Sequence, residues 1–557
     1  MDPAATPDYD LKKLLSDGRM RSPIPVALFL AIASAPCLAA QEHEHHGAER
    51  LGRVIFPVSC NPAAQQRFEP AMAMLHSFWW EEAPRAFQEV LQVDSTCAMA
   101  HWGLALNAWG NPFTGGPIGD NLQTGAAEAE RAAALGAPTV RERGFIAAAQ
   151  ALYRDHANQS SAVRLRAYSD TMARVYRDVP DDPEVALYYA LSLIATASPT
   201  DTTFARQKQA AAILNPLYAR FPDHPGLAHY IIHAYDSPGL ARLGLDAARR
   251  YSDIAPDAPH AQHMPSHIFV RLGLWSETIA SNRRSFDAGV QYDKDQGLDG
   301  VFYHEFHALD YMVYGLLQTG RDSAARRVVA EGLAIHTVRG PTPMVRGYNR
   351  TANEARIPLE TGDWRSAARL PVRDTSIPVA EMLSRFARGI GAARSGDVAQ
   401  GRREVEALQR IEQGFTSRND VYWTRIAGIK RQAVQAWVDL ASGDTVSALR
   451  EAKGAADLED VTEKHPITPG ELLPARELEA DMHFALGHYQ AARAAYLIGL
   501  ERERCRARSL FGAARSAELA GDRATAVVEY RTYLAQMANA DGERPELRIA
   551  KAGAEGR

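Results

Sequence analysis

The sequence predicts an all-α protein, a solenoid of antiparallel helix pairs, and three observations lead to this prediction. Glycine recurs at intervals of 34 to 47 residues, at Gly239, Gly273, Gly320, Gly362, Gly396, Gly443, Gly487 and Gly521. Five of these glycines are followed five residues later by an alanine, which is small enough for a second helix to pack closely on the first. No run of alternating β-branched residues indicates a sheet.

Each glycine is expected to end the first helix of a pair, because glycine adopts tight-turn conformations without a steric cost. Pro-Asp dipeptides at 180, 222 and 256 are expected to close the preceding pairs, and residues 79–87 repeat the pattern. The pattern resembles the tetratricopeptide repeat (TPR) over roughly residues 60–540. That resemblance implies a right-handed superhelix whose first helices line a concave, ligand-binding groove.

The composition excludes some partners. The 557 residues carry a net charge of −5, with both signs interspersed, and 46% of them are hydrophobic. No basic stripe suits nucleic acid, so nucleic acid is not an expected partner. A chain of this length exceeds one ordinary domain, which agrees with a repeat array.

The N-terminal region has the layout of a secretory signal peptide. A short basic start at Met20 precedes an apolar run over 24–35 and small residues over 36–40, after which the chain turns polar. The apolar run is shorter than the roughly 20 residues that a spanning helix needs. We therefore expect a periplasmic or secreted protein without a stable membrane anchor. Met1 and Met20 both remain candidates for the start.

These patterns divide the chain into successive segments. They are an N-terminal extension (1–19), a signal peptide (20–40), a His-rich polar linker (41–56), an N-terminal TPR-like array with a His-rich groove (57–335), a C-terminal TPR-like array (336–540) and a polar tail (541–557). Cys60 and Cys97 are expected either to pair in an oxidising compartment or to remain half-buried thiols.

A narrower resemblance rests on five segments that go beyond what a TPR turn requires. They are residues 75–79 (LHSFW), 97–103 (CAMAHWG), 229–236 (HYIIHAYD), 263–269 (HMPSHIF) and 464–470 (KHPITPG). In these the chain resembles a group of exported bacterial TPR-like proteins. The resemblance implies a fold and supplies no reaction.

Histidines concentrate in one part of the array. Of 18 histidines, eight lie between His224 and His307. Counted from the turn glycines, most of them fall at helical steps of three and four, which brings side chains onto one face of a helix. Three successive first helices would therefore direct imidazoles and carboxylates into one patch of the groove.

This pattern predicts a transition-metal site, because imidazole binds zinc, copper and iron well and i,i+4 histidines can chelate one ion. The predicted ligands are His229, His233, His260, His263, His267, His307 and Asp310. The two i,i+4 pairs are expected to share one ion, while His260, His307 and Asp310 complete a second site or support the first. The choice among zinc, copper and iron stays open.

Polar side chains near the same stripe are predicted to hold a small molecule or a peptide. The predicted substrate-binding residues are Arg271, Tyr314, Gln318 and Asp236, and the candidates for catalysis are Arg271, Tyr314 and Asp310. Tyr311 is expected to pack within its helix pair. Residues 464–470 form a Pro/Gly-rich loop that is interpreted either as a lid over the groove or as a plain connection.

Three functions therefore remain open from the sequence. The first is a metal-dependent hydrolase or oxidase with its site in the groove. The second is a TPR module that binds a protein or peptide without metal or catalysis. The third is a metal storage or delivery protein that uses the same ligands.

Overall fold

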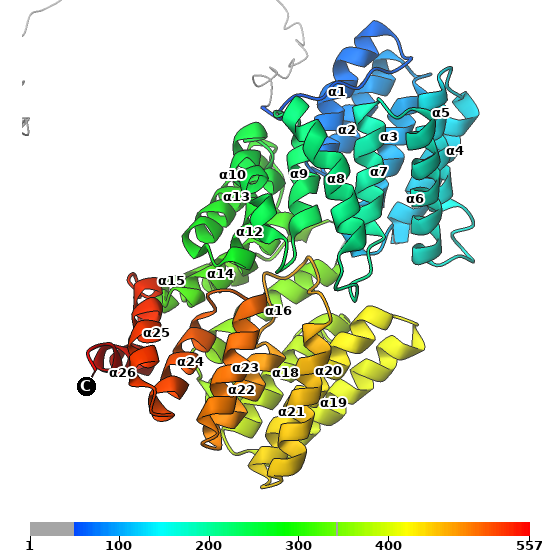
Figure 1. Cartoon of the computed structure of the whole chain (residues 1–557). Coiled ribbons are helices and arrows are strands. Elements are labelled where there is room, and N and C mark those ends of the chain that lie inside the picture. The colour runs from blue at the N-terminus through cyan, green and yellow to red at the C-terminus, as the bar shows by residue number, and fades with distance from the viewer. Residues whose placement is uncertain (1–49, 118, 341–342, 557) are drawn as a thin grey trace, which may run out of the picture. The chain divides into compact units, whose positions relative to one another are not determined.

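The computed structural model describes residues 50–117, 119–340 and 343–556, and these belong to one compact unit. The predicted N-terminal extension, the signal peptide and all but the end of the linker lie outside the described residues. The fold is the predicted all-α, TPR-like solenoid (Figure 1).

The first part of the chain forms α1 (Pro62–His76), α2 (Glu82–Val93), α3 (Ala98–Trp109), the short 3-10 helix η1 (Pro112–Thr114), α4 (Gly119–Leu135), α5 (Val140–Tyr153), α6 (Ser161–Asp178), α7 (Pro183–Ala195), α8 (Ala205–Arg220) and α9 (Pro225–Tyr235). The middle part forms η2 (Ala241–Gly244), α10 (Leu245–Ile254), α11 (Pro259–His263), α12 (Pro265–Leu272), α13 (Trp275–Asp295), α14 (Tyr303–Gln318) and α15 (Asp322–Leu333).

The last part forms α16 (Pro343–Glu360), α17 (Trp364–Ala368), α18 (Pro378–Arg394), α19 (Val398–Ser417), α20 (Val421–Ala441), α21 (Thr445–Asp460), α22 (Ala475–Ala485), α23 (Tyr489–Arg502), α24 (Ala507–Leu519), α25 (Arg523–Gln536) and α26 (Pro545–Ala554). Two-residue strands, β1 (Val301–Phe302) and β2 (Val338–Arg339), pair in parallel beside α14. The predicted polar tail thus contains a helix, α26, which packs on α25.

Consecutive helices pack against each other, and the first helices of successive pairs lie next to one another from α14 through α16, α18, α20, α22 and α24 to α26. Seven of the eight predicted turn glycines have a positive φ, as a tight turn between antiparallel helices requires. Gly239 is the exception, because α9 ends at Tyr235 and the chain continues through η2 instead of a tight turn.

A disulfide joins Cys60 to Cys97, with their Cα atoms 5.1 Å apart. Cys60 lies just before α1 and Cys97 is the residue before α3, so the bond ties the first helices of two neighbouring pairs together. Cys505 is a half-buried free thiol.

The C-terminal helices return to the middle of the chain. The hydroxyl of Tyr314 donates to Glu503 at 2.9 Å, and the backbone N–H of Ala507 donates to Gln318 at 2.9 Å. Arg544 pairs with Asp322. In an open solenoid each repeat contacts only its neighbours, whereas these contacts join distant repeats and cover part of α14.

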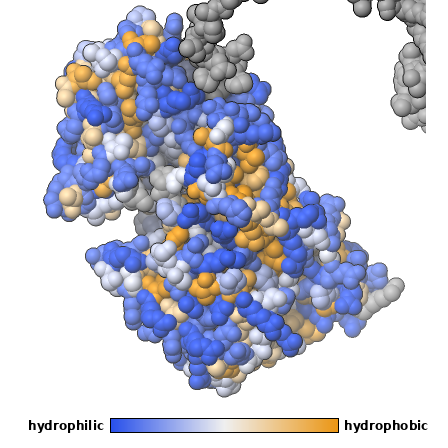
Figure 2. Space-filling model, turned by 180° about the vertical axis from the view of Figure 1, so that it is seen from behind, coloured by the Kyte–Doolittle hydropathy of each residue, from blue (hydrophilic) through white to orange (hydrophobic). Residues whose placement is uncertain are grey.

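The face drawn in Figure 2 is mostly hydrophilic, with hydrophobic residues in separate patches. Among the described residues, no helix combines the length and the apolar character needed to cross a bilayer.

Candidate metal centre

The six histidines predicted as ligands lie on α9, α11, α12 and α14, which pack against one another. Proline begins α9, α11 and α12, a position where its missing N–H costs no helical hydrogen bond. His229 and His233 are one helical turn apart on α9, and His263 and His267 are brought together across the junction of α11 and α12. The imidazoles group into two trios.

The first trio consists of His229, His233 and His260, each of which offers a ring nitrogen within 4.8 Å of the others. The Nε2 atoms of His229 and His233 lie 3.2 Å apart. His260 is buried, and neither of its ring nitrogens has a hydrogen-bond partner. A buried polar atom without a partner is costly, so this imidazole is a candidate metal ligand.

The second trio consists of His263, His267 and His307, whose ring nitrogens also lie within 4.8 Å of one another. The Nε2 atoms of His263 and His267 are 3.1 Å apart. The rings of His263 and His307 are in contact, with centroids 4.6 Å apart and an interplanar angle of 56°. Both trios therefore contain an i,i+4 pair and one histidine from elsewhere in the chain. The sequence analysis instead expected the two i,i+4 pairs to share a single ion, whereas here each pair lies with its own third histidine.

The hydrogen-bond partners determine which nitrogen carries the proton in the second trio. Nδ1 of His267 donates to the Asp236 carboxylate at 2.9 Å. Nδ1 of His263 donates to the Asn282 side-chain oxygen at 2.6 Å. That amide is oriented by its own N–H, which donates to the backbone oxygen of Thr278 at 2.8 Å. Each neutral ring therefore presents an unprotonated Nε2.

Two nitrogen lone pairs thus face each other at 3.1 Å inside the protein, which is repulsive unless a cation lies between or beside them. A proton is disfavoured, because burial holds the pKa of His263 well below its ordinary value and also lowers the pKa of His267. A metal ion satisfies both lone pairs. Nitrogens 3.1 Å apart at the usual ~2.1 Å from one ion subtend an angle of roughly 95–100°, which tetrahedral and octahedral ions both accept.

The Nδ1 atoms of several trio histidines form hydrogen bonds to neighbouring groups. Nδ1 of His229 donates to the backbone oxygen of His76 at 2.7 Å. Burial would raise the pKa of Asp236, but the charges of Lys464 and Arg271 hold it well below the usual range, so this carboxylate stays ionised beside His267. Such partners orient metal-binding imidazoles and fix their tautomers.

The predicted open groove is closed at this point. The exposed fraction of every trio histidine is 9% or less. The loop that follows α21 covers them: the hydroxyl of Tyr311 donates to the backbone oxygen of Thr468 at 3.2 Å, and Arg271 pairs with Glu463 at 3.0 Å. Residues 464–470 thus occupy the place of a lid over the histidines, one of the two interpretations of this segment.

A small cavity of about 30 Å³, the inner cavity, borders the trios. It is lined in part by His233, His260, His267, His304 and His307. Its volume is sufficient for at least one water-sized molecule. His304 reaches it because α14 begins at Tyr303, one turn before the predicted stripe, and its ring lies 4.6 Å from that of His260.

Phe78 closes the opposite side of the first trio. Its ring centroid lies 4.3 Å from that of His229 and 5.6 Å from that of His260. Phe78 has φ +53°, a left-handed conformation that costs a non-glycine residue about 1 kcal/mol or more. Surrounding contacts maintain this strained residue against the ligands.

Of the other predicted site residues, only Asp236 bonds to a trio imidazole, through Nδ1 of His267. Asp310, expected among the ligands, forms a fully buried ion pair with Arg356 instead, at 2.6 and 3.2 Å. Tyr314 and Gln318 bond to the returning C-terminal helices, as described above. Arg271 bridges Asp236 and Glu463 and so connects the carboxylate behind His267 to the covering loop.

A third cluster was not predicted. The carboxylate of Glu184 accepts from Nε2 of His76 at 3.1 Å and from Nε2 of His224 at 2.9 Å. The hydroxyl of Tyr230 supplies the hydrogen bond to Nδ1 of His76 at 3.1 Å. No lone pairs oppose each other here, and both Nε2 atoms donate to the carboxylate, while Nδ1 of His224 has no hydrogen-bond partner. The cluster supports the first trio through the carbonyl of His76.

Tyr311 and Asn282 contact the second trio, and neither was predicted as a site residue. The Tyr311 hydroxyl lies 3.4 Å from Nε2 of His267, although packing was its expected role. Asn282 is on α13, the second helix of its pair, outside the histidine stripe. Helical spacing indicates which residues share a face, but it does not indicate which residue of another helix meets that face.

Asn282→Ala is expected to weaken metal binding about 10–100-fold while the fold is kept, because His263 loses the acceptor that fixes its tautomer. The measurement is a competition titration with a chromophoric chelator. Asn215→Ala is the matched control, since Asn215 bonds Tyr235 and the Ala211 carbonyl outside the trios. Equal affinities in both variants would contradict the assigned role of Asn282.

No protein-family model matches the sequence, and no curated protein sequence matches it significantly. Similar solved structures include a human IFIT1 dimer with m7Gppp-AAAA (11% identity, 79% of this chain and 90% of that chain, TM-score 0.37). Others are yeast Tom70 (8%, 89% and 96%, TM-score 0.33) and a Naa15/Naa10 complex bound to HypK-THB (10%, 88% and 74%, TM-score 0.22). These likenesses concern the helical-repeat fold only.

Proposed function

We propose that this protein is an exported, transition-metal-dependent enzyme that acts on a small molecule at its buried histidine trios. The observation that carries the proposal is the 3.1 Å separation between the Nε2 atoms of His263 and His267, whose Nδ1 atoms are already bonded to Asn282 and Asp236. The first trio adds a buried imidazole, His260, without any hydrogen-bond partner.

Three neutral imidazoles suit zinc, copper or iron and leave coordination positions free, which is typical of catalytic rather than structural sites. A metal ion in such a site supplies Lewis acidity or redox chemistry, so hydrolysis and oxidation are the two reaction classes that fit. The protein itself holds the ligands in one tautomer, excludes bulk water with the covering loop, and keeps a small inner cavity beside them.

Export is supported by the signal-peptide pattern at residues 20–40 and by the Cys60–Cys97 pair. Disulfides persist in oxidising compartments such as the periplasm and are rare in the cytosol. We therefore place the enzyme in the periplasm or outside the cell.

Two alternative functions are protein binding and metal delivery. Helical solenoids commonly present binding surfaces to other proteins, so a protein partner remains the second candidate function. Metal delivery is less favoured, because the ligands are buried and the covering loop is tied down by Arg271 and Arg356, which would slow release.

The test is the metal content of the protein purified without a histidine tag. We expect about two equivalents of a transition metal in the wild type, one for each trio. The His263→Ala/His267→Ala variant is expected to lose about one equivalent, since three ligands hold an ion much more tightly than one. Mass spectrometry after extensive dialysis gives both values.

His483→Ala/His488→Ala is the matched control, because these two histidines also lie close, with Nδ1 atoms 3.5 Å apart, but are partly exposed and far along the chain. This variant should retain the full metal content. A wild-type protein that contains no metal, and whose thermal unfolding is unmoved by added zinc, copper or iron, would refute the proposal.

A further inference from the structure

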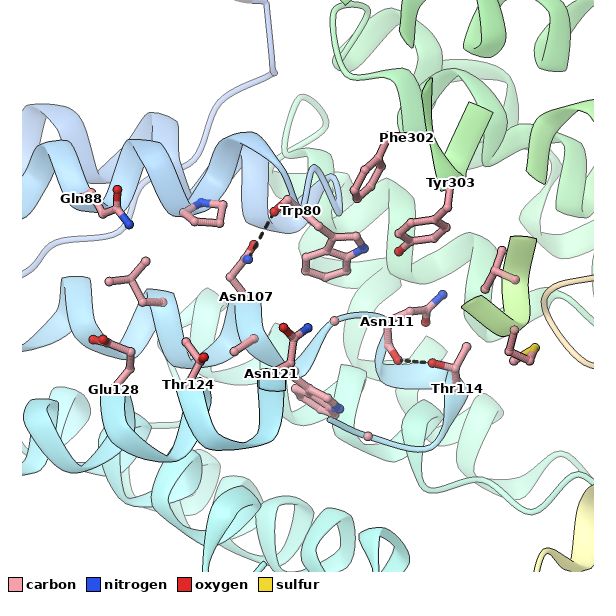
Figure 3. A pocket seen from close by; sticks show the side chains of 18 residues that line it. Trp80, Gln88, Asn107, Asn111, Thr114, Asn121, Thr124, Glu128, Phe302 and Tyr303 are labelled. Atoms are coloured by element: carbon pink, nitrogen blue, oxygen red, sulfur yellow. Dashed lines mark hydrogen bonds between the residues drawn. The ribbon is translucent and has the colours of Figure 1, made fainter. Parts of the chain in front are cut away.

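A second, larger cavity adjoins the inner cavity. This outer pocket has a volume of about 450 Å³ and is formed by α2, α3, η1, α4, β1, and the starts of α14 and α16. Its volume is in the range of sites for small organic molecules. In Figure 3, Gln88 and Glu128 lie at one end, and Phe302, Tyr303, Asn111 and Thr114 lie at the other.

The outer pocket and the inner cavity share part of their walls. Asn111, Thr114, Tyr303 and Val345 line both. The end of the outer pocket drawn near Tyr303 is therefore the end that faces the trios. Trp80 connects the two regions from another side, since its ring stacks on Phe78 with centroids 4.5 Å apart, and Phe78 packs on His229.

The outer pocket contains polar atoms without partners. The indole N–H groups of Trp80 and Trp109 and the side-chain oxygen of Asn107 are buried, and none of the three has a hydrogen bond within the protein. Trp80 and Trp109 are at least nine-tenths buried. Such groups are costly unless something binds them, and all three belong to residues that line the outer pocket.

The described lining of the outer pocket offers no positive charge to an anionic ligand. Among the described residues that line the outer pocket, none is a lysine or an arginine, and Glu128 is its single carboxylate. Glu128 is already bonded to His101 and Arg131, both at 2.6 Å. An anionic ligand would lose its hydration here without gaining a counter-charge, which costs several kcal/mol in a site of this kind.

We propose that the outer pocket binds an uncharged, ring-containing molecule that carries hydroxyl or carbonyl oxygens, and that this class supplies the substrate of the metal centre. Indole, phenyl and phenol rings of Trp80, Phe302 and Tyr303 offer flat faces to such a ring (Figure 3). The free indole N–H groups bind its oxygens, and Asn107 accepts from a hydroxyl. The role as substrate site rests on the proposed metal function, whereas the ligand class rests on the pocket alone.

The test uses two pairs of probes that differ only in charge-bearing groups: phenyl β-D-glucoside against phenyl β-D-glucuronide, and 4-hydroxybenzyl alcohol against 4-hydroxybenzoate. Binding is measured by calorimetry and tryptophan fluorescence, on the full chain before and after metal removal by a chelator. We expect at least one neutral probe to bind with Kd below about 1 mM and its anionic counterpart to bind at least about tenfold more weakly.

Trp80→Phe keeps an aromatic ring and removes one N–H donor, so it should lower the affinity for the neutral probe about tenfold. Trp437→Phe is the matched control, because the Trp437 indole is also buried with an unpartnered N–H but lies on α20, outside the pocket. The affinity of the Trp437→Phe variant for the same probe should stay within about twofold of the wild-type value. Equal losses in the two variants would overturn the assignment.

The two proposals can fail separately. A protein that contains no metal as purified, and that still binds a neutral probe, would refute the metal function and leave the ligand class standing. Failure of both neutral probes to bind at about 10 mM, or anionic probes binding as tightly, would overturn the present inference even if the protein contains metal.

Discussion

Metal-free protein should lose stability steeply as the pH falls below about 6.5. Burial lowers the pKa of His229 and of His304 to about 3, and it holds the pKa of His233, His260 and His263 well below the ordinary value. In the unfolded chain these rings take up protons near pH 6.5, which the folded protein resists. Their contribution is thus complete above the unfolded pKa and is lost as the pH falls toward the folded one.

Each such histidine costs about 1.4 kcal/mol of unfolding free energy per pH unit below 6.5. The summed cost of several such histidines exceeds the usual total stability of a domain, so we expect unfolding between about pH 6 and pH 5. Urea denaturation of chelator-treated protein at a series of pH values measures the slope. His304→Phe should reduce that slope by about one proton, because it removes one buried neutral imidazole. Both trios stay intact, since His304 belongs to neither. Stability that is constant from about pH 7.5 to pH 5.5 would contradict the burial of neutral histidines.

Arg356→Met should cost about 3–5 kcal/mol, because it leaves the Asp310 carboxylate buried without its counter-charge. Arg356 and Asp310 are both 0% exposed, and Arg356 also donates to Thr468 and to the backbone oxygen of Gly470 in the covering loop. The same change should therefore loosen this loop and speed the release of bound metal to a chelator. Chemical denaturation and a stopped-flow chelation assay give the two readouts.

The matched control is Arg283→Met, which removes a pair of partly exposed residues with Glu331 and should cost about 1 kcal/mol or less. The double variant Arg356→Met/Asp310→Leu removes both buried charges and should recover most of the lost stability. A single variant no less stable than the control would contradict the expected cost of leaving Asp310 unpaired. An unchanged rate of metal release would show that Arg356 does not hold the loop.

Local sequence patterns predicted much of this molecule. Helical spacing correctly identified the helices of the histidine region, because side chains three and four residues apart share a face whatever lies opposite. It failed at Gly239, where the chain leaves α9 without the expected tight turn. It also could not place Asp310, whose partner Arg356 lies 46 residues later on another helix.

The sequence by itself determined the fold class, seven of the eight turn glycines and six of the histidines that face inward. Only the tertiary structure decided how those histidines divide into trios, which tautomer His263 and His267 adopt, and that a loop from residue 463 onward covers them. The reason is physical. Periodicity is a property of one helix, whereas an imidazole's proton and its exposure to water depend on atoms that other helices bring to it.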